Sequence, residues 1–168
     1  MSLIVEDGTG LATAESYISV ADATTYFTAR SVTTWGALAT DALREAALRR
    51  ATEYMMQMYR DRWQGLRAYP TVQVLDWPRT GVVVDFVTVD YDTVPVEVAR
   101  ACAELALKAS VATLSPDLKQ GKLSVQVGPI KTEWDKNSPQ RKRYVAIDDM
   151  LRPYLKSGGG ASVGLVRT

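Results

Sequence analysis

The 168 residues, of which 46% are hydrophobic and 23% charged, are enough for one domain with a hydrophobic core. The sequence has no histidine and a single cysteine, Cys102, which excludes Ser-His-Asp and Cys-His catalysis, a disulfide framework and a cysteine zinc site. We therefore expect no enzyme, no cofactor and no metal site, and no membrane association, because no apolar run approaches the roughly 20 residues of a membrane span.

Charge is unevenly distributed along the chain, although the formal net charge is only +1. Residues 1–29 carry four acids and no lysine or arginine, whereas residues 119–143 carry seven lysines and arginines against two acids. Blocks of alternating sign suit a protein that docks on copies of itself or on charged partners, or simply a well-solvated surface. The low net charge argues against a globally basic nucleic-acid binder.

Two helices are predicted in the first third of the chain, after an extended N-terminal arm over residues 1–15. Ser19 is the expected N-cap of a helix over about 20–29, and Thr40 caps a longer helix that ends near Arg62-Trp63-Gln64-Gly65. Apolar residues of the longer helix recur at steps of three and four, which predicts one buried face. That face comprises Leu43, Ala47, Ala51, Tyr54, Met55 and Met58.

The middle of the chain is predicted to be irregular over residues 66–93, followed by a helix over about 94–114. Within the irregular part, Trp77 and Arg79 belong to the run LDWPRTG and serve either to lock the loop onto the core or as an interface. Pro95 suits the first turn of the following helix, where its missing N–H has no cost.

A β-hairpin over about 122–134 and a fourth helix over about 145–155 are predicted in the last third. Lysines and arginines between 119 and 143 suit phosphate binding, with Trp134 available to stack on a base, or a solvated hairpin edge. Asp148 and Asp149 either bind a cation or are surface charges near a helix start. A glycine-rich linker then leads to the apolar tip Val163, Leu165, Val166 and Arg167, which suggests a docking tail over 156–168, or a frayed terminus.

Six segments carry a resemblance to a known family: SYISVADATTYF, REAALRRATEYM, LDWPRTG, VPVEVARACAELAL, VGPIKTEW and AIDDMLRPYL. Their order resembles that of tailed-phage head–tail adaptor proteins, also called connector or head-completion proteins. The same family is often filed as DnaT-like single-stranded-DNA-binding proteins. The similarity covers about residue 15 to the end, and its most specific parts are residues 77–81 and 151–154.

The resemblance implies a mainly α fold: a small four-helix bundle over residues 16–155 with a projecting β-hairpin and extended N- and C-terminal arms. It implies a non-enzymatic virion protein of the head–tail neck that is assembled in the host cytoplasm. The protein would form a ring, and the resemblance to the family implies that this ring is a dodecamer. Its implied partners are copies of itself, the portal protein, a tail-completion or stopper protein, and double-stranded DNA that passes without tight binding.

Site residues follow from the same resemblance. The tail residues Val163, Leu165, Val166 and Arg167 would grip the portal. Inter-subunit or DNA-channel contacts would come from Lys131, Lys136, Arg141, Lys142 and Arg143. The alternative function is that of a single-stranded-DNA-binding protein of phage replication.

Overall fold

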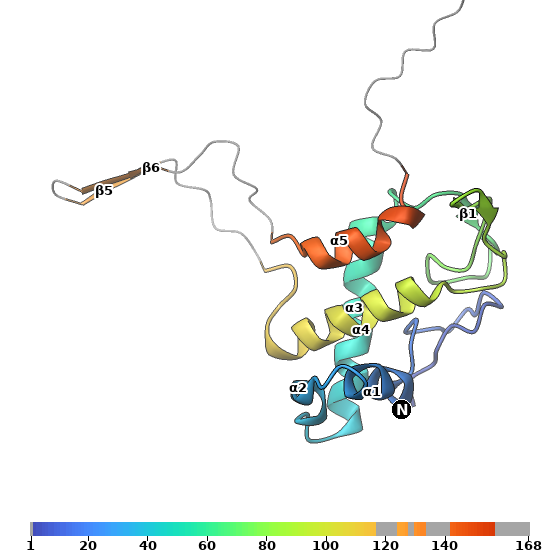
Figure 1. Cartoon of the computed structure of the whole chain (residues 1–168), viewed down its shortest axis with the longest axis horizontal. Helices are drawn as coiled ribbons and strands as arrows, with labels where there is room; N and C mark the ends of the chain where they lie inside the picture. The colour runs from blue at the N-terminus through green and yellow to red at the C-terminus, as the bar shows by residue number, and fades with distance from the viewer. Residues whose placement is uncertain (1, 117–123, 128–129, 134–141, 157–168) are drawn as a thin grey trace, which may run out of the picture.

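Two long helices, α3 (Asp41–Tyr59) and α4 (Val96–Val111), form the centre of the fold in this computed structural model, which describes residues 2–116, 124–127, 130–133 and 142–156. Shorter helices pack against this pair: α1 (Val20–Thr28) contacts both, and α5 (Val145–Leu151) contacts α4. In Figure 1, α4 and α5 run across α3. The chain is helix-rich, as predicted, but this arrangement does not confirm a four-helix bundle.

Helix α1 begins where the sequence predicts, because its N-cap is a local feature. The Ser19 hydroxyl accepts a hydrogen bond from the Asp22 N–H at 3.0 Å and donates one to the Asp22 carboxylate at 2.6 Å. Thr40 caps α3 in the same way through the Leu43 N–H. Helix α4 is shorter than predicted at both ends: Pro95 is extended (ψ 143°) and is the N-cap instead of a first-turn residue, and the chain becomes extended again at Ala112.

The buried face of α3 differs from the predicted one at its beginning. Leu43 is 51% exposed, whereas Leu48 and Thr52, which the pattern did not include, are buried. In Figure 1, α4 crosses α3 beyond its beginning, whereas α1 and α2 lie near that beginning, so the spacing of apolar residues alone does not decide which side chains are covered. The segment between α1 and α3 contains a short helix, α2 (Thr33–Gly36), which carries the buried Trp35.

The segment before α1 is extended, as expected of an arm, yet it is packed against the domain. The buried carboxylate of Glu6 accepts hydrogen bonds from the N–H groups of Gly8, Gly10 and Leu11 at 2.9–3.0 Å. Glu15 forms an ion pair of 2.9 Å with Arg49 on α3. The Glu6 bonds fold the segment on itself, whereas the Glu15–Arg49 pair joins it to α3, a contact between distant residues that composition alone does not indicate.

The irregular stretch 66–93 contains two short antiparallel strand pairs and is held by aromatic side chains. Strand β1 (Leu66–Arg67) pairs with β2 (Arg79–Thr80), and β3 (Val83–Val84) pairs with β4 (Val87–Thr88). A chain of ring contacts with centroids 5.7 Å apart joins the end of α3 to this stretch and to the 3₁₀ helix Arg152–Tyr154. This aromatic chain consists of Tyr59, Trp63, Trp77 and Tyr154.

The predicted hairpin is present as β5 (Ser124–Val127) paired antiparallel with β6 (Ile130–Glu133). In Figure 1 these strands stand apart from the helices. The predicted helix over 145–155 is α5 followed by the 3₁₀ helix, and the predicted docking tail from residue 157 onward lies outside the described residues. None of the described helices is both long and apolar enough to cross a membrane.

Candidate nucleic-acid interface

The charge of each surface hollow decides whether it suits a phosphate backbone. One hollow, of about 610 Å³, lies beside α1 and the start of α4. Its charged lining residues are Glu6, Asp7, Asp22, Arg30, Asp92 and Arg100. Four acids against two arginines disfavour an anionic ligand.

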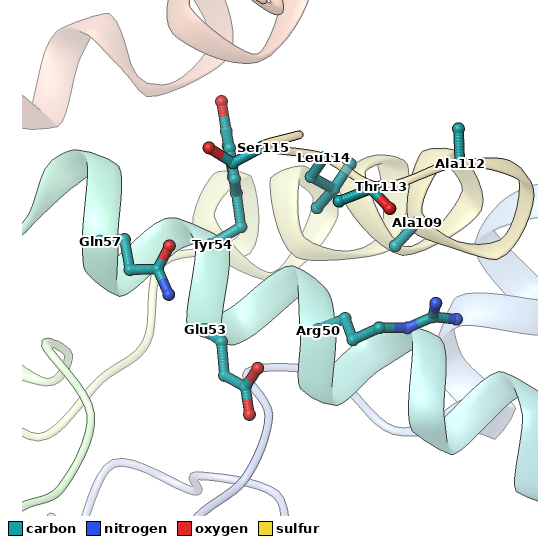
Figure 2. A pocket seen from close by; sticks show the side chains of 9 residues that line it. All are labelled: Arg50, Glu53, Tyr54, Gln57, Ala109, Ala112, Thr113, Leu114 and Ser115. Carbon is teal, nitrogen blue, oxygen red and sulfur yellow. The ribbon is translucent and has the colours of Figure 1, made fainter. Parts of the chain in front are cut away.

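A hollow of about 180 Å³ between α3 and the end of α4 is also a weak candidate for a phosphate backbone. Figure 2 shows Arg50 and Glu53 projecting from α3, with Leu114 and Ser115 where the chain leaves α4. The lining holds one arginine and one glutamate, so it has no net charge.

A third hollow, of about 340 Å³, is basic and is lined by the end of α3 and the start of α5. We call it the basic cleft. Its lining residues are Tyr54, Met58, Tyr59, Arg62, Lys142, Arg143, Tyr144 and Asp148. Three cations against one carboxylate leave two positive charges in excess, which is the sign that a nucleic-acid backbone requires.

Tyr144 is the aromatic centre of the basic cleft. Its half-buried ring has the ammonium of Lys142 at 5.3 Å from the centroid and that of Lys108, on α4, at 5.8 Å. The ring edge of Tyr54 packs against it at 5.6 Å, and the Tyr144 hydroxyl donates to the Leu114 carbonyl at 3.2 Å. These contacts hold the ring and place two cations beside it, a favourable cation–π arrangement.

Asp148 holds the two arginines of the cleft in place. Its carboxylate accepts hydrogen bonds from Arg143 Nε at 2.8 Å and the Tyr59 hydroxyl at 2.9 Å, and lies 3.5 Å from Arg62 Nη1. Burial acts to raise the pKa of Asp148, but the bonds from Arg143 and Tyr59 outweigh burial and keep that pKa below its usual value. Asp148 is therefore ionised at neutral pH and orients Arg143, which remains exposed to solvent.

Tyr59 positions this network and offers no stacking surface, because its side chain is buried. Burial raises the pKa of its hydroxyl, and the hydrogen bond to Asp148 raises that pKa further. No group of three or more histidines, cysteines and acids in the described part of the chain is placed to hold a metal ion.

Only part of the predicted site can be placed. Lys142 and Arg143 both line the basic cleft. Lys131 lies on β6, opposite Gln126. Lys136, Arg141, Trp134 and the tail residues Val163, Leu165, Val166 and Arg167 lie outside the described residues.

The two remaining predicted site residues, Trp77 and Arg79, are buried in the body of the domain. Trp77 contacts the rings of Trp63 and Tyr154, and Arg79 donates hydrogen bonds to three backbone carbonyls. These contacts tie the loop to the core, while a role at an interface between chains stays a prediction.

Sequence reasoning missed Arg62, Tyr144 and Lys108 as members of this surface. Tyr144 directly follows the basic run that ends at Arg143, which is a usable signal for an aromatic residue beside cations. No such signal exists for Arg62, which is 80 positions before Lys142 and reaches the cleft only through the packing around the end of α3.

Comparison with protein families gives one match, and it covers the whole chain. The family model described as "Putative DnaT-like ssDNA binding protein" matches residues 1–168. Comparisons with curated proteins and with solved structures give no match. Because that model matches every residue, the chain belongs to the DnaT-like single-stranded-DNA-binding family so described.

Proposed function

We propose that this protein binds single-stranded DNA and that the basic cleft is the contact surface. The observation that carries the proposal is the clustering of Arg62, Lys142 and Arg143 around the half-buried ring of Tyr144. Cations neutralise backbone phosphates, and an aromatic ring stacks on a base whatever its identity. The family description supports this reading.

The cleft fits a single strand better than a duplex. Stacking on a tyrosine requires an unpaired base that leaves its neighbours, and a single strand supplies such bases at little cost. With two positive charges in excess, the cleft engages few phosphates, so we expect modest affinity that falls as salt rises.

Lys142→Gln is expected to flatten the salt dependence of binding to oligo-dT. Loss of one phosphate contact on a single strand lowers the slope of log K against log salt by about 0.7. Fluorescence anisotropy from low to moderate salt measures the slope. Arg50→Gln is the matched control, because it removes one exposed positive charge from α3 outside the cleft.

Tyr144→Ala should weaken binding without changing that slope, since a stacking contact carries no charge. The proposal fails if the wild-type protein shows no salt-dependent binding to oligo-dT. It also fails if Arg50→Gln changes the slope as much as Lys142→Gln does.

A head–tail adaptor is the second candidate, favoured by exposed apolar residues on and beside the β3–β4 hairpin. The side chains of Leu66, Phe86 and Val87 are exposed, and Phe86 at the tip of the hairpin is fully so. Exposed apolar groups of this size are typical of protein interfaces. We propose that an adaptor function would use this surface between subunits of a virion ring, with the segment after Lys156 reaching the portal.

Native mass spectrometry with purified portal protein tests the adaptor proposal. We expect a complex of the protein and the portal at matching ring stoichiometry. Phe86→Ser should lower the fraction of protein that assembles into the ring, and deletion of residues 158–168 should abolish portal attachment. A monomer that forms no complex with the portal protein would exclude this function and leave DNA binding as the proposed function.

A further inference from the structure

We propose that a second pocket, near the end of α3, binds a phosphate group through three arginines. This arginine pocket has a volume of about 520 Å³. Its lining residues are Arg60, Leu66, Arg67, Ala68, Pro70, Asp76, Arg79 and Thr80. The proposal deepens the proposed function by adding a phosphate contact outside the basic cleft, and its test separates the two.

The strand register brings two arginines together. In the β1–β2 pair, Arg67 lies directly opposite Arg79, so both side chains leave the same face of the pair. Like charges in directly opposite positions are destabilising by themselves. An anion between the two guanidinium groups removes that repulsion.

Arg79 is a buried cation without a direct carboxylate partner among the described residues. Only 6% of the Arg79 surface is exposed to solvent. The guanidinium donates three of its five N–H groups to the carbonyls of Gln64, Gly65 and Asp76 at 2.7–3.0 Å, and the nearby Asp76 carboxylate attracts it without a direct hydrogen bond. Burial lowers the pKa of Arg79, nearby Asp76 opposes that effect, and the charges of Arg67 and Arg60 lower the pKa further. Because Asp76 also pairs with Arg60, its single negative charge is shared between two guanidinium groups, and the pocket favours a further anion.

The one carboxylate in the pocket does not balance three arginines. Asp76 is buried and its Oδ1 accepts a hydrogen bond of 2.9 Å from Arg60 Nε. Burial raises the pKa of Asp76, against the opposing effect of Arg60. Even with Asp76 ionised, the lining keeps two positive charges in excess.

The donors that remain suit a phosphate. Arg60 uses Nε for Asp76, and its terminal nitrogens have no partner among the described residues. Arg67 donates from both terminal nitrogens to the carbonyls of Gln73 and Pro70, which holds its guanidinium at the pocket. Planar guanidinium groups match phosphate oxygens in geometry and in charge. The volume also leaves room for the sugar to which a phosphate is attached.

Both basic surfaces have a lining residue just after the end of α3. Arg60 lines the arginine pocket, and Arg62, two residues later, lines the basic cleft. A DNA strand that crosses this end of the helix would reach both. The phosphate would then belong to the strand itself, either as an internal diester or as a terminal monoester, and free phosphate is the other source with the same chemistry.

Titration of the full-length protein with inorganic phosphate at constant ionic strength tests the pocket, with thermal unfolding and calorimetry as readouts. Phosphate should raise the melting temperature above the value in chloride. Arg67→Gln should weaken phosphate binding about tenfold, the effect of losing one charge-assisted hydrogen bond. Arg67→Lys keeps the charge but lacks the planar guanidinium, so its affinity for phosphate should lie between those of the wild type and Arg67→Gln. Arg50→Gln is the control and should bind phosphate as the wild type does.

Oligo-dT with and without a 5′-phosphate identifies the source. If the 5′-phosphate raises the affinity for oligo-dT and Arg67→Gln abolishes that increase, the ligand is a terminal monoester. If Arg67→Gln lowers the affinity for both oligonucleotides equally, the ligand is an internal diester. If phosphate binds and neither oligonucleotide responds to Arg67→Gln, free phosphate is the ligand.

The inference is overturned if phosphate stabilises the protein no more than chloride does, or if Arg50→Gln weakens phosphate binding as much as Arg67→Gln. In that case a salt slope that depends on Lys142 would still support the basic cleft. Conversely, if the protein binds phosphate but does not bind oligo-dT, the arginine pocket is supported and the proposed function is refuted.

Discussion

Trp77→Ala is expected to lower the free energy of unfolding by about 4 kcal/mol, the largest effect that we predict for this protein. The Trp77 ring is fully buried and contacts Trp63 and Tyr154 edge-on, both with centroids 5.7 Å away. It therefore joins the end of α3, the loop over 66–93 and the 3₁₀ helix. Urea denaturation followed by tryptophan fluorescence measures the loss.

Trp77→Phe is the matched control and should cost much less. Phenylalanine keeps an aromatic ring in the cavity, and it also removes the Trp77 indole N–H, which is buried without a hydrogen-bond partner among the described residues. If Trp77→Ala costs less than about 1 kcal/mol, the aromatic chain does not lock the loop.

Loss of Trp77 should also affect the basic cleft. The aromatic chain runs from Trp77 through Trp63 to Tyr59, whose hydroxyl donates to Asp148. Looser packing at Trp77 therefore frees the carboxylate that orients Arg143. We expect Trp77→Ala to weaken DNA binding even under conditions in which the variant is still folded.

Gly65→Ala is expected to cost about 3 kcal/mol or more, because two effects add. Gly65 has a φ of +61°, which a side chain disfavours, and an added Cβ would lie 2.1 Å from the backbone oxygen of Thr80. That oxygen cannot move without separating β1 from β2, where Leu66 pairs with Thr80. Circular dichroism during thermal and urea unfolding measures the effect.

Gly81→Ala separates strain from steric overlap. Gly81 also has a positive φ, +73°, but the nearest atom to an added Cβ is 4.0 Å away. This variant should lose only about 1 kcal/mol. Equal losses at both positions would show that overlap with Thr80 contributes nothing.

Gly65→Ala should in addition impair the arginine pocket. The Gly65 carbonyl accepts a hydrogen bond of 2.8 Å from Arg79 Nη2, so displacement of Gly65 moves the guanidinium. Phosphate binding by the folded fraction should therefore fall in Gly65→Ala and remain in Gly81→Ala.

The sequence was informative wherever a few neighbouring residues decide the structure. Ser19 and Thr40 were identified as N-caps because a cap bonds to an N–H three residues later. The β5–β6 hairpin was predicted because strand alternation and a turn lie within a dozen residues. Two of the three cations that line the candidate site, Lys142 and Arg143, were likewise visible as a basic run.

Tertiary structure alone decided how distant residues combine. Arg62 lines the same cleft as Lys142 and Tyr144. Arg67 faces Arg79 across two strands of two residues each, which are too short to show a periodic pattern. Leu43 matched the helical pattern and still became exposed, since burial depends on whether another element covers that turn. Hydrogen bonds within a turn of helix or a hairpin are encoded locally. The position of charges relative to one another depends on packing between segments that the sequence separates, and in this protein both candidate binding surfaces arise at that level.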